Sequence, residues 1–531
     1  MEMNRIATWG LALLVGIVCA SLPAAAADFS AGAAKAAITP HEPAYLAGYD
    51  SNRLSEVVQS DIWVRALVIK SGEKTLSLAV VDLIGFPNLL QRQVRGLVKA
   101  VPADSVIIAA THSHSAPDPI GLWGPEEGKS GVNKPWLEAT LKTIAATIDQ
   151  AAQNAKPAKL KLAAIETKGI ARNIRVPRIV DPELAVMQFV DAEGKAIATL
   201  ANIACHAEIM QNKMLSADFP HYYYQKIEKD LGGIALFVNG AEGGMVTADI
   251  DDLYKKEGQD NSALAEKIGL LVADFTENAL KEAKTVESPA LDYKVADLLV
   301  PLESDRYRAA IQAGLLPNTL QDGKLRTQVA VIALGPAQIV TIPGEALPNL
   351  GFRLKRSMTG SPKFIFGLTF DELGYIMSAD DWGLQLYDYE SRTGMGPDTG
   401  PTLISALLPL IAEVKPAAPA AAAGGTGQVA AWFAGLTSKF KPDRAEGITA
   451  TYHFKISGDG GGDWTVAIAD KKCKVENKAP DKADLAVAIS AQDWMDLVGG
   501  KLDAMAAFSS GRLVLDGDMG LAMQIPTLFF D

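Results

Sequence analysis

The sequence predicts an α/β protein built of mixed sheets with flanking helices, followed by a small α+β unit. Short apolar stretches rich in Val and Ile alternate with longer stretches in which apolar residues recur at helical spacing. Near the C-terminus, polar and apolar residues alternate as they do in half-buried strands. Because 48% of the 531 residues are hydrophobic, the chain can bury large cores. Its net charge of −12 argues against nucleic acid as a partner and predicts weak attraction to anionic bilayers.

Residues 1–27 have the features of a secretory signal peptide. Arg5 precedes an apolar stretch over 7–22, which is short for a membrane span, and an A-x-A cleavage site ends at Ala27. We expect the mature chain to begin at Asp28 and to be exported to a periplasm or to the exterior. An uncleaved anchor is the alternative. Only two cysteines follow this segment, which gives no disulfide framework.

A linker divides the rest of the chain into two units. Residues 415–427 consist mainly of Ala, Gly and Pro and present no periodic apolar face. They separate a large unit, 28–414, from a small unit, 428–531.

The large unit begins with an expected hairpin of strands 62–70 and 75–81, joined by Ser-Gly-Glu-Lys. Helix 89–101 follows, predicted by apolar residues at helical spacing, and then a short buried strand over 105–110. The same two patterns predict strands over 196–205, 234–239, 337–342 and 363–370, and an amphipathic helix over 261–280.

The first candidate functional residues stand at the end of strand 105–110, in the segment THSHSAPD. His112 and His114 are two apart, so in an extended chain both rings project to one side, as in H-x-H metal sites. The alternative is a pair of structural histidines hydrogen-bonded to their neighbours. Ala116 and Pro117 do not fit the H-x-H-x-D-H motif of metallo-β-lactamases, and six histidines in the whole chain are few for an amidohydrolase barrel.

Three more polar residues stand at or just after strand ends. His206 ends the strand over 196–205, Glu345 follows 337–342, and Tyr375 follows 363–370. Because open α/β sheets bind ligands beyond the carboxyl ends of their strands, these residues converge with His112 by position. Taken singly, Glu345 also fits a carboxylate at a helix N-terminus, and Tyr375 a packed aromatic.

Five segments resemble, in order, motifs of the neutral/alkaline (non-lysosomal) ceramidase family: THSHSAP, IACH, LSADFP, IPGE and LGYI. The resemblance covers roughly residues 30–413. It implies one catalytic Zn²⁺ per chain, held by His112, His206, Glu345 and Tyr375, with His114 beside the metal. It also implies that Arg172 or Arg175 helps to position the substrate, and that Tyr389 lies near the metal.

The implied donor set is compatible with hydrolysis. Two imidazoles and two oxygen ligands can bind Zn²⁺ and leave a position for water, which the metal acidifies so that hydroxide can attack an amide or ester carbonyl. His114 would then suit proton transfer to the leaving amine, and an arginine would stabilise the oxyanion. Two segments depart from the family pattern, namely NGAEGGMVTAD (239–249) and Phe370-Asp371-Glu372. A related N-acyl lipid or another amphiphile therefore stays open as the substrate.

The small unit is predicted to form a meander of strands over 448–456, 464–469, 473–476 and 485–490, then a helix over about 491–498. Its closing segment, 506–529, resembles the end of the sterol-carrier-protein domain. That resemblance implies an apolar cavity for acyl chains or sterols. An adaptable lining by Met495, Met505, Met519 and Met523 would suit it, and ordinary core packing is the alternative.

Two functional hypotheses follow. The first is an exported zinc-dependent amidohydrolase that cleaves the N-acyl amide bond of ceramide or a related acylated amphiphile, releasing fatty acid and a sphingoid-type amine, while the small unit holds lipid. The second is a catalytically silent lipid-binding or lipid-transfer protein. Retention of all four implied ligands favours the first. The expected partner is a lipid substrate, with transient contact to a membrane surface and no nucleic acid.

Overall fold

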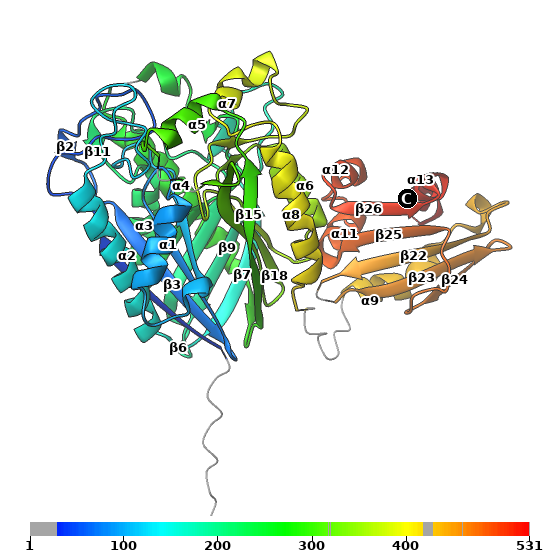
Figure 1. Ribbon diagram of the computed structural model, residues 1–531. Helices are drawn as coiled ribbons and strands as arrows, with labels where there is room; N and C mark the ends of the chain where they lie inside the picture. Colours follow the sequence, from blue (N-terminus) through cyan, green and yellow to red (C-terminus); the bar gives the residue numbers. More distant parts are fainter. Residues whose placement is uncertain are drawn as a thin grey trace, which may run out of the picture.

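The computed structural model describes residues 29–529 apart from 257, 317, 319, 418–427 and 459 (Figure 1). The expected signal peptide and most of the expected linker lie outside these residues. The α/β class of the large unit and the small α+β unit are both confirmed.

The described part of the large unit is built around three mixed sheets of five strands each. The first has the order β5 (Val106–Ala110), β4 (Lys74–Val81), β3 (Trp63–Ser71), β1 (Phe29–Ala37), β6 (Lys156–Pro157). The second has the order β12 (Ile234–Asn239), β10 (Ala196–Ile203), β9 (Glu183–Val190), β7 (Lys159–Glu166), β14 (Lys284–Val286). The third has the order β15 (Leu291–Pro301), β17 (Lys324–Leu334), β18 (Ala337–Thr341), β20 (Lys363–Phe366), with β16 (Leu320–Gln321) beside β17. Each sheet contains one parallel pair, which is β4/β5, β10/β12 or β18/β20.

Helices cover the outer faces of these sheets (Figure 1). The first sheet packs against α1 (Asn88–Leu97) and α2 (Lys134–Gln153), the second against α3 (Phe219–Asp230) and α4 (Ser262–Lys281), and the third against α6 (Pro348–Ser357) and α8 (Thr399–Glu413). Two shorter helices, α5 (Asp305–Gln312) and α7 (Asp388–Arg392), lie beyond one end of the sheets (Figure 1).

The inner faces of the three sheets share one apolar core. Strand β3 shows why its sequence is almost continuously apolar: Leu67 and Ile69 face this shared core, whereas Val64 and Val68 face the helices. A strand that is buried on both faces has no need of polar residues at alternate positions. The layered arrangement therefore follows directly from the apolar stretches of the sequence.

Some predicted elements end earlier than expected. The helix predicted over 89–101 ends at Leu97, because Asp149 of α2 accepts hydrogen bonds from the backbone N–H groups of Lys99 and Ala100 (2.9 and 2.7 Å). The strand predicted over 363–370 ends at Phe366, since the chain turns sharply where Leu368 and Phe370 adopt positive φ angles.

Three short strand pairs connect the loops beyond the sheets. They are β2 (Val57–Val58) with β11 (Met214–Leu215), β8 (Ala171–Asn173) with β13 (Val246–Ala248), and β19 (Glu345–Ala346) with β21 (Tyr375–Ile376). The last pair is parallel and sets Glu345 opposite Tyr375.

The small unit forms one sheet in the order β24 (Lys472–Glu476), β23 (Gly462–Ala469), β22 (Ala450–Ser457), β25 (Leu485–Ser490), β26 (Leu513–Gly517). Its helices are α9 (Gln428–Ala434), α10 (Leu436–Lys439), α11 (Ala491–Val498), α12 (Ala504–Ser509) and α13 (Met519–Phe529). The core is rich in aromatic rings, with Phe433 stacked between Trp464 and Trp494.

The methionines of the small unit do not line its interior as expected. Met505, Met519 and Met523 are 68%, 47% and 73% exposed, because α12 and α13 turn these side chains outward. Met495 packs against the edge of the core. Among all described residues of both units, the helices are too short or too polar to cross a bilayer.

Candidate metal centre

The carboxyl ends of the three parallel strand pairs meet in one region. The buried Asn202 side chain on β10 donates to the carbonyl oxygens of Val238 on β12 (2.9 Å) and Ile365 on β20 (2.8 Å). The backbone N–H of Ala110, at the end of β5, donates to the carbonyl of Leu368 beyond β20 (3.0 Å). These bonds fix the strand ends to one another, so the segments that leave them enter the same small volume.

His112 and His206 direct one nitrogen each toward Glu345. Nε2 of His112 lies 3.4 Å from Glu345 Oε2, and Nε2 of His206 lies 3.0 Å from the same oxygen. Their Nδ1 atoms lie 2.6 Å from the carbonyl of Ile84 and 3.0 Å from that of Val246. Since a carbonyl can only accept, Nδ1 carries the hydrogen in both rings and Nε2 is left for a metal.

The electrostatics of this cluster are those of buried, opposite charges. Burial alone would lower the pKa of His206, but the hydrogen bond to Glu345 and the neighbouring carboxylates raise it to about 10. Burial would raise the pKa of Glu345, but His112 and His206 hold it well below its usual range. A carboxylate oxygen flanked by two imidazole nitrogens is a donor set that binds divalent transition metals.

The local backbone at His112 differs from the extended chain that the H-x-H spacing predicts. His112 has a φ of +68°, and its N–H donates to the carbonyl of Leu83 (3.0 Å). This conformation is unfavourable for a non-glycine residue and is typical of functional sites. The turn still brings the rings of His112 and His114 together, with centroids 4.7 Å apart.

The ring of His114 lies beside those of His112 and His206. It is 7% exposed, and neither ring nitrogen has a hydrogen bond among the described residues. Burial, followed by the neighbouring His112 and His206, lowers its pKa well below the ordinary value. Gly48, with a φ of +96°, makes room for the ring, because a Cβ there would stand 2.3 Å from it. The ring is therefore held neutral beside the centre.

Tyr375 and Tyr389 also lie at this site. The Tyr375 ring stacks on His206 at 6.5 Å between centroids, and its hydroxyl lies 3.9 Å from the sulfur of Met245. Tyr389, on α7, lies 5.8 Å from Tyr375 and is half exposed. Both rings thus line the same cavity as His112 and Glu345.

The two candidate arginines lie elsewhere. Arg172 binds the carboxylate of Asp251 (2.9 Å) and the carbonyl of Ile250, and Nε of Arg175 donates to the buried carboxylate of Glu390 (2.7 Å). Neither lines the cavity described below. Arg175 thus binds α7 through Glu390, and Arg172 binds the loop after β13. The expectation that one of them positions the substrate stays a prediction.

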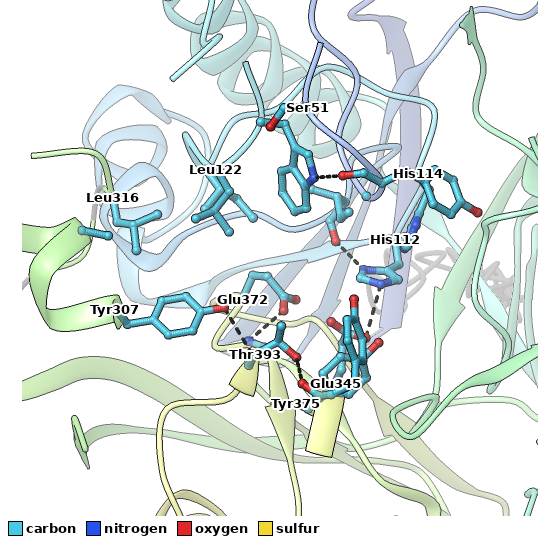
Figure 2. A pocket seen from close by; sticks show the side chains of 18 of the residues that line it. Ser51, His112, His114, Leu122, Tyr307, Leu316, Glu345, Glu372, Tyr375 and Thr393 are labelled. Atoms are coloured by element: carbon cyan, nitrogen blue, oxygen red, sulfur yellow. Dashed lines mark hydrogen bonds and ion pairs between the residues drawn. The ribbon is translucent and has the colours of Figure 1, made fainter. Parts of the chain in front are cut away.

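A cavity of about 750 Å³ opens onto this centre (Figure 2). His112, His114, Glu345 and Tyr375 form one end. An apolar part of the wall is formed by Ile120, Leu122, Trp123, Tyr307 and Leu316, and the charged side chains of Glu127 and Arg306 also line the cavity. This size and polarity suit a ligand with a polar, reacting group and an apolar arm.

Two carboxyl groups of the site escaped prediction. Glu372 lies in the cavity wall. One of its carboxylate oxygens, a ring nitrogen of His112 and a carboxylate oxygen of Glu345 all lie within 4.8 Å of one another. Glu242 is completely buried and interacts electrostatically with His206 and Glu345, and neither of its oxygens has a hydrogen bond within the described part of the chain. The sequence did mark both segments, since each stands in a loop that departs from the ceramidase pattern.

The comparisons with known proteins agree with this division into two units. The chain is similar in structure to the neutral ceramidase of Pseudomonas aeruginosa, with a TM-score of 0.62 and 19% identity over 75% of this chain and 76% of that chain. A ceramidase complexed with C2 gives a TM-score of 0.61 and 19% identity over 73% and 76%. The expected ceramidase-like fold is therefore confirmed.

Residues 433–530 match the model of the SCP-2 sterol transfer family, which confirms the expected sterol-carrier domain. Among curated proteins, hydroxysteroid dehydrogenase-like protein 2 of Danio rerio is 31% identical over 100 residues, which are 19% of this chain and 24% of that protein. The human protein of the same name is 31% identical over 104 residues, 19% and 25% of the two chains. The chain thus spans about a quarter of the length of these curated relatives. It joins a ceramidase-fold unit to an SCP-2 domain.

Proposed function

We propose that this protein is an exported zinc-dependent amidohydrolase that cleaves the N-acyl amide bond of ceramide or a related acylated amphiphile. The products are a fatty acid and a sphingoid-type amine. One observation carries the proposal: the buried His112–His206–Glu345 cluster adjoins a cavity with an apolar part in its wall. The ceramidase-like fold supports the choice of an N-acyl lipid as substrate.

The residues present fit a zinc ion. Each imidazole has its Nδ1 hydrogen bonded to a backbone carbonyl, so both Nε2 atoms are available as ligands beside Glu345. Tyr375 is the proposed fourth ligand. Bound zinc would lower the pKa of a water molecule to about 7 and polarise the substrate carbonyl.

The surrounding residues would bind the substrate and move a proton. The apolar part of the cavity wall would hold the acyl chain and exclude water from the amide. The neutral His114 has both nitrogens unpaired and suits proton transfer to the leaving amine. Arg306 and Glu127 also line the cavity, and Nη2 of Arg306 lies 3.6 Å from Oε1 of Glu127. The Arg306 guanidinium would contact a polar group of the substrate.

The SCP-2 domain supports lipid as the ligand of the small unit. We propose that this domain holds lipid substrate or released fatty acid near the hydrolase, and that residues 1–27 direct export. Contact with a membrane surface would then be transient, as the acidic net charge predicts.

The test combines metal content with hydrolysis by the full mature chain. Fatty acid release would be measured on N-acyl sphingosines, N-acyl ethanolamines and N-acyl amino acids, in the wild type and in His112→Ala and Glu345→Ala. We expect one zinc ion per chain in the wild type, and loss of zinc and turnover in both variants. Glu413→Gln, at the end of α8, alters an exposed ion pair with Lys294 of β15 and serves as the matched control. Unchanged hydrolysis in both site variants would refute the assigned centre, and zinc without turnover on any lipid would favour the silent lipid-binding protein.

A further inference from the structure

Glu372 lies in the wall of the cavity, in the loop between β20 and β21. One of its carboxylate oxygens lies within 4.8 Å of the ligand atoms of both His112 and Glu345. Figure 2 shows its side chain pointing into the cavity, between Tyr307 and Glu345. It thus stands where a ligand of the same ion would stand.

The orientation of Glu372 is fixed by the fold. Its Oε1 accepts a hydrogen bond from the backbone N–H of Gly374 (2.9 Å), while Oε2 is buried and has no partner among the described residues. Its Cβ and Cγ pack over Gly85, where an added Cβ would lie only 2.5 and 2.6 Å from them. The space that Gly85 leaves open is therefore filled by the Glu372 stem, which limits the positions that its carboxylate can take.

The charges of the centre favour a cation beside Glu372. Glu242 is completely buried, and a carboxylate oxygen of Glu372 lies within 4.8 Å of the ligand atoms of Glu345 and His112, so acidic groups gather around this point. Hydrogen bonds do not reach either oxygen of Glu242 or the second oxygen of Glu372 among the described residues. Buried carboxylate oxygens without partners are costly, and a divalent cation bound by Glu345 and Glu372 would remove part of that cost.

The two groups of candidate ligands describe one ion. The first group is His112, His114 and His206, and the second is His112, Glu345 and Glu372. His112 belongs to both, but its Nδ1 is bonded to the carbonyl of Ile84, so it offers a single nitrogen. One ion bound to that nitrogen can draw further ligands from both groups.

We propose that Glu372 is a further ligand of the metal ion, in addition to the proposed ligands His112, His206, Glu345 and Tyr375. The inference rests on the proposed function, which places a metal at this centre. Two carboxylates make the donor set harder than one, and carboxylate oxygens suit Mn²⁺ while imidazoles suit Zn²⁺. The site should therefore accept Mn²⁺ as well as Zn²⁺, and Mn²⁺ should depend more strongly on Glu372.

The test measures metal affinity directly, by competition with a chromogenic chelator on the full mature chain. Glu372→Gln keeps an oxygen that can accept from Gly374, so the loop is preserved while the carboxylate is lost. We expect Zn²⁺ affinity to fall about 10- to 100-fold, as for groups that support a metal site, and Mn²⁺ affinity to fall further. Gly85→Ala, which displaces the Glu372 stem, should weaken both metals in the same direction.

A spectroscopic readout separates ligation from a structural effect. In the Co²⁺-loaded protein, loss of a ligand changes the visible d–d bands, whereas a displaced loop that keeps the ligand set leaves them unchanged. Glu127→Gln is the matched control, because it removes a cavity carboxylate that is exposed and paired with Arg306. It should leave affinity and spectrum as in the wild type.

The outcomes separate this inference from the proposed function. If the wild type and His112→Ala both fail to bind zinc, the metal centre itself is refuted, and this inference with it. If the wild type binds zinc and His112→Ala does not, but Glu372→Gln keeps wild-type affinities and Co²⁺ bands, only the role of Glu372 is refuted.

Discussion

The Asn202 side chain provides a quantitative test of how the strand ends are held together. Its Nδ2 lies within hydrogen-bond distance of three carbonyl oxygens, those of Val238 (2.9 Å), Asn239 (3.1 Å) and Ile365 (2.8 Å). Asn202→Leu keeps the volume of the side chain but removes the donors. The strands β10, β12 and β20 would then lose their shared contact beneath the metal centre.

The size of the effect follows from the number of hydrogens. An amide NH₂ group has two hydrogens, so it supports about two bonds at a time. Each bond contributes about 0.5–1.5 kcal/mol, and a buried carbonyl left unpaired costs about 1–3 kcal/mol. We therefore expect Asn202→Leu to lower the free energy of unfolding by about 2–4 kcal/mol.

Hydrogen exchange measured by mass spectrometry on the metal-free chain provides the assay, since it reports each segment separately. Peptides from the ends of β10, β12 and β20 should exchange faster, and zinc affinity should fall because His206 follows β10. Asn278→Leu, at an exposed position of α4, is the matched control. If exchange at the three strand ends is unchanged and stability falls by less than about 0.5 kcal/mol, Asn202 does not hold them together.

Three further predictions concern other parts of the chain. Burial raises the pKa of Asp218 to about 7, above its value of about 3.9 in an unfolded chain. Between these pH values the folded state binds one more proton than the unfolded state, so the free energy of unfolding falls as the pH rises from 4 to 7. Asp218→Asn should remove this fall, which a series of urea titrations at different pH values would measure. Arg175→Met removes the ion pair of the buried Glu390 and should loosen α7 and Tyr389. The KM should therefore rise while the zinc content stays the same. A fall in kcat at unchanged KM would instead show that Arg175 stabilises the transition state. The third change replaces the three exposed methionines of the small unit by Gln, at Met505, Met519 and Met523. It should change the free energy of unfolding by less than about 0.5 kcal/mol and leave the binding of a fluorescent fatty acid intact. Loss of binding would instead place these side chains in the lipid cavity.

Local patterns predicted most elements of the fold. Strands such as β12 and β25 and the helix α11 have the bounds that periodicity gave, because their apolar residues alternate or recur as burial requires. Ends were less well predicted where a distant side chain decides them. Beyond α1, the Asp149 carboxylate accepts the backbone N–H groups that would continue the helix. Beyond β10, which ends at Ile203, the Asn239 side chain accepts the N–H of Cys205 (2.9 Å).

The candidate ligands could be found from the sequence because each follows a buried strand. The arginines could not be placed in this way, since Arg172 and Arg175 lie in a segment whose direction depends on Asp251 and Glu390. The methionines of the small unit were misplaced for a similar reason. An apolar side chain carries no local signal of which face its helix buries when the helix is short and apolar all round.

By itself, the sequence determined the strands and the helices that cover them. It also placed four polar residues after strand ends at one edge of the sheets, namely His112, His206, Glu345 and Tyr375. Only the tertiary structure decided which atoms meet there. Nε2 of two histidines reaches Glu345 because backbone carbonyls occupy their Nδ1 atoms, and Glu372 reaches the same centre because Gly85 has no side chain. Such contacts join residues far apart in the chain, so neither propensity nor periodicity encodes them, and packing alone brings them within bonding distance.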